Sequence, residues 1–285
     1  MNKIVDKKNE YIEMYPDEFL KEIERNPIGY LPLGAMEWHS FHLPLGYDGL
    51  AAEYFFRELA KIKGGVVMPT VFYGVAENMP HPASMVISDN SYKNFLRSIF
   101  KGLINLNFRI LIVATGHWSI NQMKCLIDTA IEVMSKNKDI LISGLPLGFI
   151  CMDDGIKIDH AGKYETSLGM ALFPDKVRLE RLGKKYLGQW KFPDVEQLAE
   201  FGIEGDDDPR QTASSEYGEK ILNLMLKKYS ELIDEMLSSR RSRLDYYHSS
   251  AINFTKTNFS DFYKDIDPVK FYKKVSKIIK KKKYF

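Results

Sequence analysis

The sequence predicts an α/β protein whose central sheet is mostly parallel, with helices on both faces. Segments typical of strands and of helices alternate along the 285-residue chain, and this alternation is typical of βαβ units around a parallel sheet. One strand segment, RILIVAT at residues 109–115, is an almost unbroken apolar run rich in β-branched residues. Such a run is expected of a strand that is covered on both faces.

The N-terminal elements follow from their end signals and from the spacing of apolar residues. Residues 16–25 begin with proline and two acids, which suit the first turn of a helix. Residues 28–33 are a short apolar run and indicate a buried strand. Residues 49–62 carry apolar side chains at helical spacing, and a second short strand is expected at residues 66–69. The loop that follows at residues 71–88 is rich in proline and glycine, and loops of this length in a compact domain are usually functional.

The middle of the chain repeats the same alternation. Ser91 is expected to cap a helix that reaches about residue 105, with Phe95, Ile99, Leu103 and Leu106 on its apolar face. After the strand at 109–115, the expected elements are a helix at residues 119–135, a strand at 139–145, a helix at 168–172 and a long amphipathic helix that starts at Thr212 or Ser214. Together they complete a parallel sheet covered by helices.

The composition is that of an ordinary globular protein, with 45% hydrophobic and 27% charged residues. No run of about 18 apolar residues is present, so a membrane-spanning helix is not expected, and the N-terminus lacks the apolar stretch of a signal peptide. The two cysteines, Cys125 and Cys151, are too few for a disulfide framework. The sequence therefore predicts a cytoplasmic protein with no membrane partner.

The net charge of +2 conceals a basic C-terminus. Residues 270–285 contain eight lysines and no acid, whereas residues 1–269 carry 32 basic and 38 acidic side chains and a net charge of −6. The tail is interpreted as a partly helical arm that docks on the body rather than as a nucleic-acid-binding segment, because the body is acidic and lacks a nucleic-acid-binding module. The expected organisation is one domain at residues 1–240, followed at 241–285 by a polar linker and a lysine-rich arm.

Three polar clusters interrupt the apolar pattern, and the first is LPLGAMEWHSFHLPLGYD at residues 31–48. If the chain stays extended, Glu37 and His39 project from the same face, and Asp48 follows after a turn. Carboxylate and imidazole ligands together suit Zn, Mn or Fe better than Ca or Mg. A polar loop with core histidines is the alternative, because a lone E-x-H motif is too short to decide.

The other two clusters also stand beside turn residues. His117 follows the strand at 109–115, and His160 and Glu165 flank a glycine in DHAGKYETS. Ligands of parallel sheets bind beyond the carboxyl ends of the strands, where His117 and Glu37 are both expected. Glu165 has a structural alternative as well, since a carboxylate is favoured in the first turn of a helix.

Taken together, the three clusters resemble the creatininase (creatinine amidohydrolase) family. Its pattern runs roughly P-x-G-x-x-E-x-H-G-x-H-L-P-x-x-x-D, then a strand ending in G-H, then H-x-G-x-x-E-T-S, and the order and spacing match from about residue 28 to 175. The resemblance implies a three-layer α/β/α fold with a mostly parallel central sheet. It also implies one or two divalent metal ions per chain (Zn, Mn or Fe) and a homo-oligomer, with hexamers common in the family.

The resemblance also assigns roles within the site. It implies that Glu37, Asp48 and His117 hold one metal and that His39 and Asp48 hold a second, so that Asp48 bridges them. Glu165 is then a ligand or an acid/base group, and His160 works on the substrate or on the leaving nitrogen.

Departures from the family pattern point away from creatinine as the substrate. Members that act on creatinine carry a metal-binding glutamate where this chain has Ser119, and the usual glycine after the E-x-H histidine is Ser40. The candidate substrate-binding residues are Trp118, Ser119, His81 and Tyr73. For Trp118 and Tyr73, an ordinary place in the core is the alternative.

The resulting hypothesis is a metal-dependent hydrolase that cleaves a C–N amide bond of a small molecule (a cyclic amide, formamide or short peptide) with a metal-activated water. His160 and Glu165 would be its catalytic groups. The alternative is a non-catalytic relative that keeps the fold and binds a small ligand or an acidic partner. Nucleic acid is not the expected partner.

Overall fold

The computed structural model describes residues 9–76, 83–183 and 201–257, together with residues 269, 270, 273, 274 and 277. Its sheet has the strand order β2-β1-β3-β4, and β5 also pairs with β3. The strands are β1 (Ile28–Leu33), β2 (Val66–Val67), β3 (Ile110–Thr115), β4 (Leu141–Ile142) and β5 (Leu145–Pro146). The strand pairings among the described residues are parallel, as expected from the sequence.

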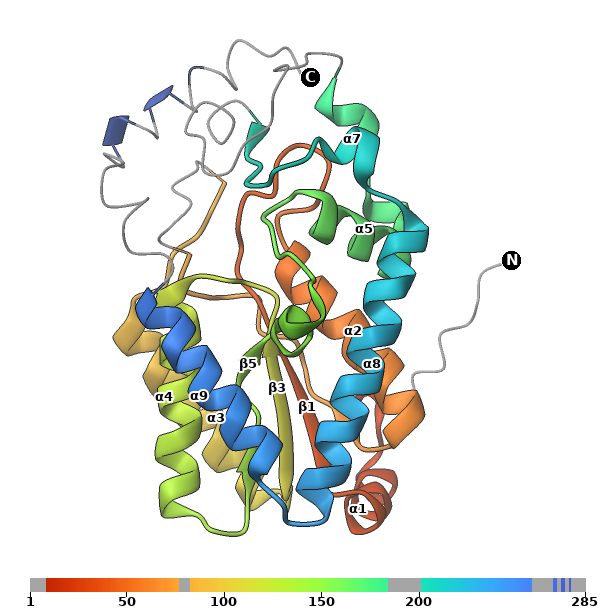
Figure 1. The fold of residues 1–285 in the computed structure, drawn as a ribbon. Helices are drawn as coiled ribbons and strands as arrows, with labels where there is room; N and C mark the ends of the chain where they lie inside the picture. Colours follow the sequence, from red (N-terminus) through yellow and green to blue (C-terminus); the bar gives the residue numbers. More distant parts are fainter. Residues whose placement is uncertain are drawn as a thin grey trace.

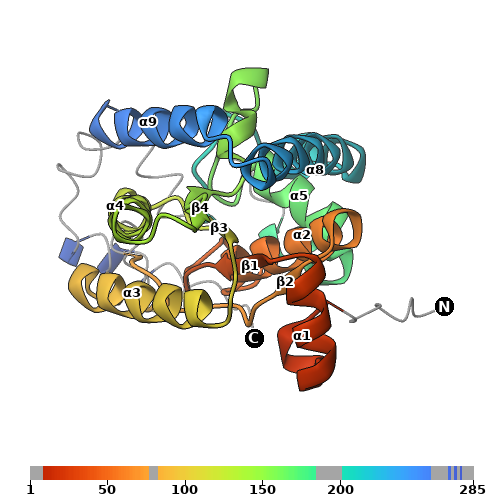
Figure 2. The ribbon, with the colours of Figure 1, turned by 90° about the horizontal axis from the view of Figure 1, so that it is seen from below.

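Helices cover both faces of this sheet. The α-helices are α1 (Pro16–Arg25), α2 (Tyr47–Lys63), α3 (Asp89–Asn105), α4 (Ile120–Lys136), α5 (Lys163–Leu172), α7 (Pro209–Thr212), α8 (Ser215–Leu237) and α9 (Ser242–Thr257). The 3-10 helices are η1 (Tyr11–Glu13), η2 (Phe149–Asp154), η3 (Pro174–Lys176) and η4 (Leu179–Leu182). Figure 2 shows α3 and α4 on one side of the sheet and α2, α5 and α8 on the other, which confirms the three-layer α/β/α fold. Within the described part of the chain, no helix combines the length and apolar character needed to cross a membrane.

The two central strands, β1 and β3, are buried along their whole length, in agreement with their apolar sequences. Their register pairs Leu33 with Thr115, so both strands end at the same edge of the sheet (Figure 1). The loops that follow them, which carry the first two polar clusters, therefore begin side by side.

Two local predictions need correction. The cap of α3 is Ser88, whose side chain accepts a hydrogen bond from the Ser91 amide, so the helix starts earlier than expected. Of the expected apolar face, Leu103 is buried and Ile99 and Leu106 pack partly buried against the core, whereas Phe95 is 48% exposed and Leu96 and Phe100 are buried instead. The strand expected at 139–145 is divided into β4 and β5 because Gly144 adopts a φ of +54°, which interrupts an extended strand.

The polar linker expected after residue 240 is wrong over the range of α9. This segment is a helix that packs against α4, α8 and β5, and Figure 1 shows it lying along α4. Leu244, Tyr247 and Ala251 are buried at helical spacing among polar residues that conceal the pattern in the sequence. Most of the lysine-rich tail lies outside the described residues, so the division of the chain at residue 240 stays a prediction.

Candidate metal centre

The loop between β1 and α2 places Glu37 and His39 in the site. Glu37 and His39 lie outside the strands, in a loop that is held firmly, because the Glu37 amide donates to the Leu45 carbonyl at 2.9 Å and the Trp38 amide donates to Ser84 Oγ at 3.1 Å. Both site side chains are buried. Ser40 has a φ of +59°, a region that favours glycine, which gives a physical reason for the glycine at this place in the family pattern.

Asp48 reaches the site because the N-terminus of α2 lies directly against the ends of β1 and β3. A Cβ on Gly34 would stand 2.2 Å from the Gly49 nitrogen, and a Cβ on Gly116 would stand 2.2 Å from the Asp48 carbonyl oxygen. Any side chain at either glycine would therefore push the helix away. The two glycines allow a carboxylate from the first turn of α2 to stand between the two strand ends.

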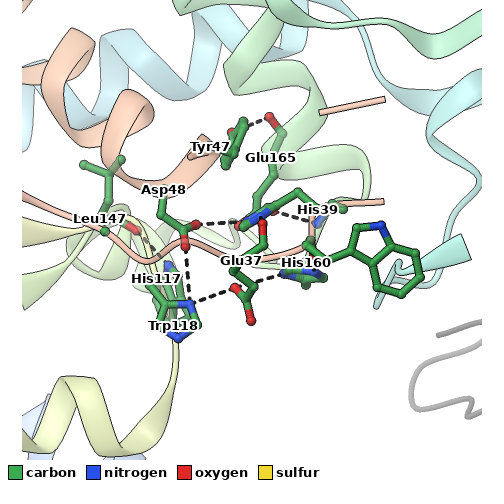
Figure 3. A network of polar contacts seen from close by, with 12 residues as sticks. Glu37, His39, Tyr47, Asp48, His117, Trp118, Leu147, His160 and Glu165 are labelled. Atoms are coloured by element: carbon green, nitrogen blue, oxygen red, sulfur yellow. Dashed lines mark hydrogen bonds and ion pairs between the residues drawn. The ribbon is translucent and has the colours of Figure 1, made fainter. Parts of the chain in front are cut away.

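The first candidate ligand group is Glu37, Asp48 and His117. His117 Nδ1 lies 2.9 Å from Glu37 Oε2 and 3.4 Å from Asp48 Oδ2 (Figure 3). The other ring nitrogen, Nε2, lies 3.0 Å from the Val75 carbonyl oxygen, to which its proton can be donated. That hydrogen bond selects the tautomer with a lone pair on Nδ1, the arrangement usual for a metal-binding histidine.

The second candidate group is His39, Asp48 and Glu165. His39 Nε2 lies 2.9 Å from Asp48 Oδ1 and 3.5 Å from Glu165 Oε2. On the opposite side of the ring, Nδ1 lies 3.2 Å from the Glu37 carbonyl oxygen and can donate to it, which leaves Nε2 as the ligand atom. Asp48 belongs to both groups and offers one oxygen to each, as expected for a bridging carboxylate.

His160 stands at the edge of the two groups. Its Nδ1 is 3.9 Å from Glu37 Oε2, its Nε2 donates to the Trp38 carbonyl oxygen at 2.9 Å, and its ring centroid is 4.4 Å from that of His39. It also forms a possible ligand group with Glu37 and His39. The backbone of His160 pairs with Glu204, which fixes the loop that carries it.

Glu165 lies in the first turn of α5, as the sequence allowed. Its Oε2 accepts a hydrogen bond from the Ala161 amide at 2.6 Å, and Asp159 accepts from the Glu165 and Tyr164 amides. Burial raises the pKa of Asp159 to about 7, against the effect of these amide donors. The turn and the helix start therefore hold the Glu165 carboxylate against the site.

The electrostatics of the site are those of buried opposite charges. Burial acts to lower the pKa of His39, but Asp48 and Glu165 outweigh it and raise the pKa to about 10. Burial likewise opposes a raised pKa for His117, and Glu37 and Asp48 overcome it. For Asp48, burial acts to raise the pKa, and His39 and His117 bring it below its usual range. Burial raises the pKa of Glu165 well above its usual range. Without a cation, protons on the two histidines therefore balance the charges of Glu37 and Asp48.

These residues fit a divalent cation. Within the part of the chain that the structure describes, His39 Nε2 and both carboxylate oxygens of Asp48 are buried and make no hydrogen bond of acceptable geometry, although ion-pair partners lie nearby. Buried polar atoms without such bonds are costly. A donor set of carboxylate oxygens and imidazole nitrogens suits Zn, Mn or Fe.

A cavity of about 920 Å³ opens in front of the cluster. It is lined by Glu37, Asp48, His117 and Glu165 of the ligand groups, by the apolar side chains of Trp118, Met152, Ile156 and Phe254, and by the polar side chains of Lys157, Lys163, Asp206, Asp207 and Tyr217. This size is within the usual range of small-molecule sites.

The residues expected to bind substrate do not all lie at the cavity. Trp118 lines the cavity, with its indole nitrogen donating to the Leu147 carbonyl at 3.2 Å (Figure 3). Ser119 also borders the cavity, but its hydroxyl caps α4 by accepting from the Gln122 amide. Tyr73 is 54% exposed and is not among the described residues that line the cavity. His81 lies outside the described residues.

Gln122 supports the site from behind, and no sequence pattern indicates this role. Its side-chain oxygen accepts from the Val75 amide at 2.7 Å, and its nitrogen donates to the Gly34 carbonyl and to Thr115 Oγ1 at 3.1 and 2.7 Å. This buried amide joins the ends of β1 and β3 to the loop segment at Val75, whose carbonyl accepts from His117. Only the fold brings these distant segments together.

Comparison with known proteins gives consistent results. The chain matches the creatininase family model, described as creatinine amidohydrolase, over residues 13–233. It is 27% identical over 233 residues to the creatinine amidohydrolase of Pseudomonas putida, covering 72% of this chain and 88% of that protein. It is also 24% identical over 164 residues to a 3-dehydro-scyllo-inosose hydrolase of Thermotoga maritima, covering 53% of this chain and 51% of that protein.

Solved structures show the same fold. A crystal structure of creatinine amidohydrolase aligns with a TM-score of 0.66 at 21% identity, over 80% of this chain and 97% of that chain. A creatininase described with Mn aligns with a TM-score of 0.62 at 23% identity, over 80% of this chain and 98% of that chain. A creatininase variant described as a Zn-Zn type aligns with a TM-score of 0.61 at 21% identity, over 80% and 97%.

Proposed function

The chain belongs to the creatininase family, and on that basis we propose that it is a metal-dependent hydrolase that cleaves a C–N amide bond of a small molecule. The substrate class is a cyclic amide, a formamide or a short peptide. The observation that carries the proposal is Asp48, a buried carboxylate with one oxygen toward each of two ligand groups and no hydrogen bond of acceptable geometry among the described residues.

One or two divalent cations complete this site in the proposal. Glu37, Asp48 and His117 hold the first, and His39, Asp48 and Glu165 hold the second. Zn and Mn are the leading candidates, because solved creatininases are described with these metals and the donor set suits them. When bound, such a cation polarises an amide carbonyl and activates a water molecule.

His160 is the proposed proton carrier. It is only partly buried, lines the cavity and donates through Nε2 to the Trp38 carbonyl, so its Nδ1 lone pair faces the ligand cluster. In the absence of a cation, burial, together with the charge of His39, lowers the pKa of His160 to about 4, so this imidazole is neutral at pH 7. After accepting a proton, the same nitrogen can pass it to the departing amine.

Glu165 acts in this scheme mainly as a ligand. Because the Ala161 amide fixes its Oε2 at 2.6 Å, the carboxylate is held beside His39. It thereby completes the second ligand group, for which the creatinine-cleaving members have a glutamate and this chain has Ser119. Since this chain has Ser119, whose hydroxyl caps α4, where members that act on creatinine carry a metal-binding glutamate, creatinine is not the proposed substrate.

The first test measures the metal content per chain by elemental analysis, on protein prepared without a chelator or histidine tag. Wild type is compared with Asp48→Ala, and with Asp175→Ala, which removes an exposed carboxylate, as the control. Two metals per wild-type chain, with both lost only in Asp48→Ala, would support a bridging Asp48. One metal would support a mononuclear hydrolase.

The result that would overturn the proposal is a wild-type chain without metal, or full metal content in Asp48→Ala. Turnover is tested separately with a panel of cyclic amides, formamides and dipeptides. If Glu37→Gln and His117→Ala both kept full turnover of an identified substrate, the proposed mechanism would be wrong.

The family resemblance also leads us to propose a homo-oligomer. Sedimentation velocity of the full chain tests this directly, and a single monomeric species over a range of concentrations would contradict it.

A further inference from the structure

One part of the cavity wall comes from the C-terminal helix α9. Phe254 lines the cavity, yet it lies beyond residue 233, where the match to the family model ends. The helix is held against the body by buried residues such as Leu244 and Ala251 and by its contacts with α4, α8 and β5. The segment after the family-matched region is therefore placed to affect what enters the site.

Phe254 belongs to a cluster of three aromatic rings. Its ring centroid is 6.0 Å from Trp118 and 5.9 Å from Phe149, with interplanar angles of 77° and 83°. Trp118 and Phe149 lie 6.0 Å apart at 35°. The edge-on contacts of Phe254 are the arrangement that aromatic pairs prefer.

This cluster has a buried base and a surface on the cavity. Phe149 is buried, whereas Trp118 and Phe254 are partly buried and both line the cavity. The hydrogen bond from the Trp118 indole to the Leu147 carbonyl fixes the orientation of that ring. The Trp118 ring is therefore held in place before any ligand binds, with Phe254 edge-on beside it, so little order is lost when a flat group packs there.

The aromatic wall stands beside the chemistry. Trp118 directly follows His117, a member of the first ligand group, and Met152 extends the apolar surface. The same cavity is also lined by Lys163 and Asp206. A molecule whose amide lies at the cluster would thus meet both an apolar surface and charged groups.

We propose that Phe254 and Trp118 form a binding wall for a flat apolar substituent, aromatic or heterocyclic, of the substrate. Phe254 is thereby a specificity-determining residue supplied by the C-terminal helix. This inference rests on the proposed function, because the substituent is taken to be attached to the amide that the ligand cluster acts on.

Two uncharged lactams test the inference: 2-pyrrolidinone and 4-phenyl-2-pyrrolidinone, which differ only in a phenyl group. Binding to the full-length protein, as purified with its metal, is measured by titration calorimetry or ligand-observed NMR. Wild type is expected to bind the phenyl compound about tenfold more tightly or better, because the phenyl group leaves water. Phe254→Ala should remove most of this preference and leave the affinity for 2-pyrrolidinone unchanged.

Two further variants keep the test decisive. Phe254→Leu retains an apolar side chain against Phe149 but loses the flat ring, so it should fold and still reduce the preference at least threefold. Lys256→Ala, on the same helix and exposed, should bind both compounds as wild type does. If wild type shows no preference for the phenyl compound, or if both Phe254 variants keep it, the inference is wrong.

Binding and cleavage separate this inference from the proposed function. A phenyl preference that disappears in the Phe254 variants, without cleavage of any amide in the panel, would support the wall and argue against the hydrolase. Cleavage of amides with no role for Phe254 would support the hydrolase and overturn the wall.

Discussion

Replacing Gln122 by leucine tests how the site is supported from behind. The two side chains are similar in size, so the substitution leaves no large cavity, but it removes all the hydrogen bonds of a fully buried amide. Thr115 Oγ1 keeps its contact with the His117 amide. The Val75 N–H and the Gly34 carbonyl lose the side-chain partners that Gln122 provides.

The expected loss of stability follows from these two backbone groups, the Val75 N–H and the Gly34 carbonyl. A buried polar group left without a partner costs about 1–3 kcal/mol, so Gln122→Leu should lower the free energy of unfolding by roughly 2–6 kcal/mol. This is a large share of the ~5–15 kcal/mol typical of a folded domain. Because Val75 also accepts from His117 Nε2, metal affinity should fall about 10–100-fold, as for other residues that orient a metal-binding histidine.

Urea unfolding gives the stability, and competition with a metal-binding dye gives the affinity. Gln211→Leu, which changes an exposed glutamine, is the matched control and should leave both unchanged. If Gln122→Leu loses less than about 1 kcal/mol and binds metal as wild type does, the amide does not position His117 and the reasoning fails.

Four other substitutions test separate parts of the structure. Gly116→Ala should push α2 away and lower both the metal content and the stability. Gly102→Ala, where a Cβ meets nothing within 4 Å, should instead stabilise α3 by about 1 kcal/mol. Thermal melts in which the two variants show equal shifts would contradict this. Ser119→Ala should cost about 1 kcal/mol in urea unfolding through loss of the α4 cap with unchanged metal content, and loss of metal would mean that its hydroxyl is a ligand. Burial lowers the pKa of His42 to about 3, so the folded state resists its protonation and this residue's contribution to stability decreases as the pH falls below about 6.5. The difference in free energy of unfolding between wild type and His42→Gln should therefore shrink by about 3 kcal/mol from pH 7 to pH 4. A difference that stays constant over this range would refute the lowered pKa of His42.

The sequence was sufficient for those elements whose signals are local. The apolar runs that became β1 and β3 and the polar clusters that follow strands could be recognised directly, and Glu37, Asp48 and His117 do come together. Helix α9 was missed because its few buried residues are separated by polar ones. The break at Gly144 depends on one backbone angle, which no local apolar pattern reports.

The parts of the site that could not be predicted depend on contacts between distant segments. Gln122 bonds to Gly34 across 88 positions and to Val75 across 47, so nothing near it in the sequence announces its role. Phe254 joins Trp118 only because α9 returns along α4. Tyr73 is the reverse case: an aromatic side chain in a long loop predicted a binding role, yet Tyr73 is 54% exposed and is not among the described residues that line the cavity.

The shared position of Asp48 has a thermodynamic consequence for any pair of cations bound at this centre. Because one carboxylate serves both ligand groups, the two binding events are linked, and neither site has an affinity independent of the other. Whatever factor the first cation imposes on the affinity for the second, the second imposes on the first. Titrations of this protein with metal should therefore be analysed as cooperative, of either sign, and a substitution at Glu165 should change the affinity measured at His117, although no contact joins the two residues directly among those that the structure describes.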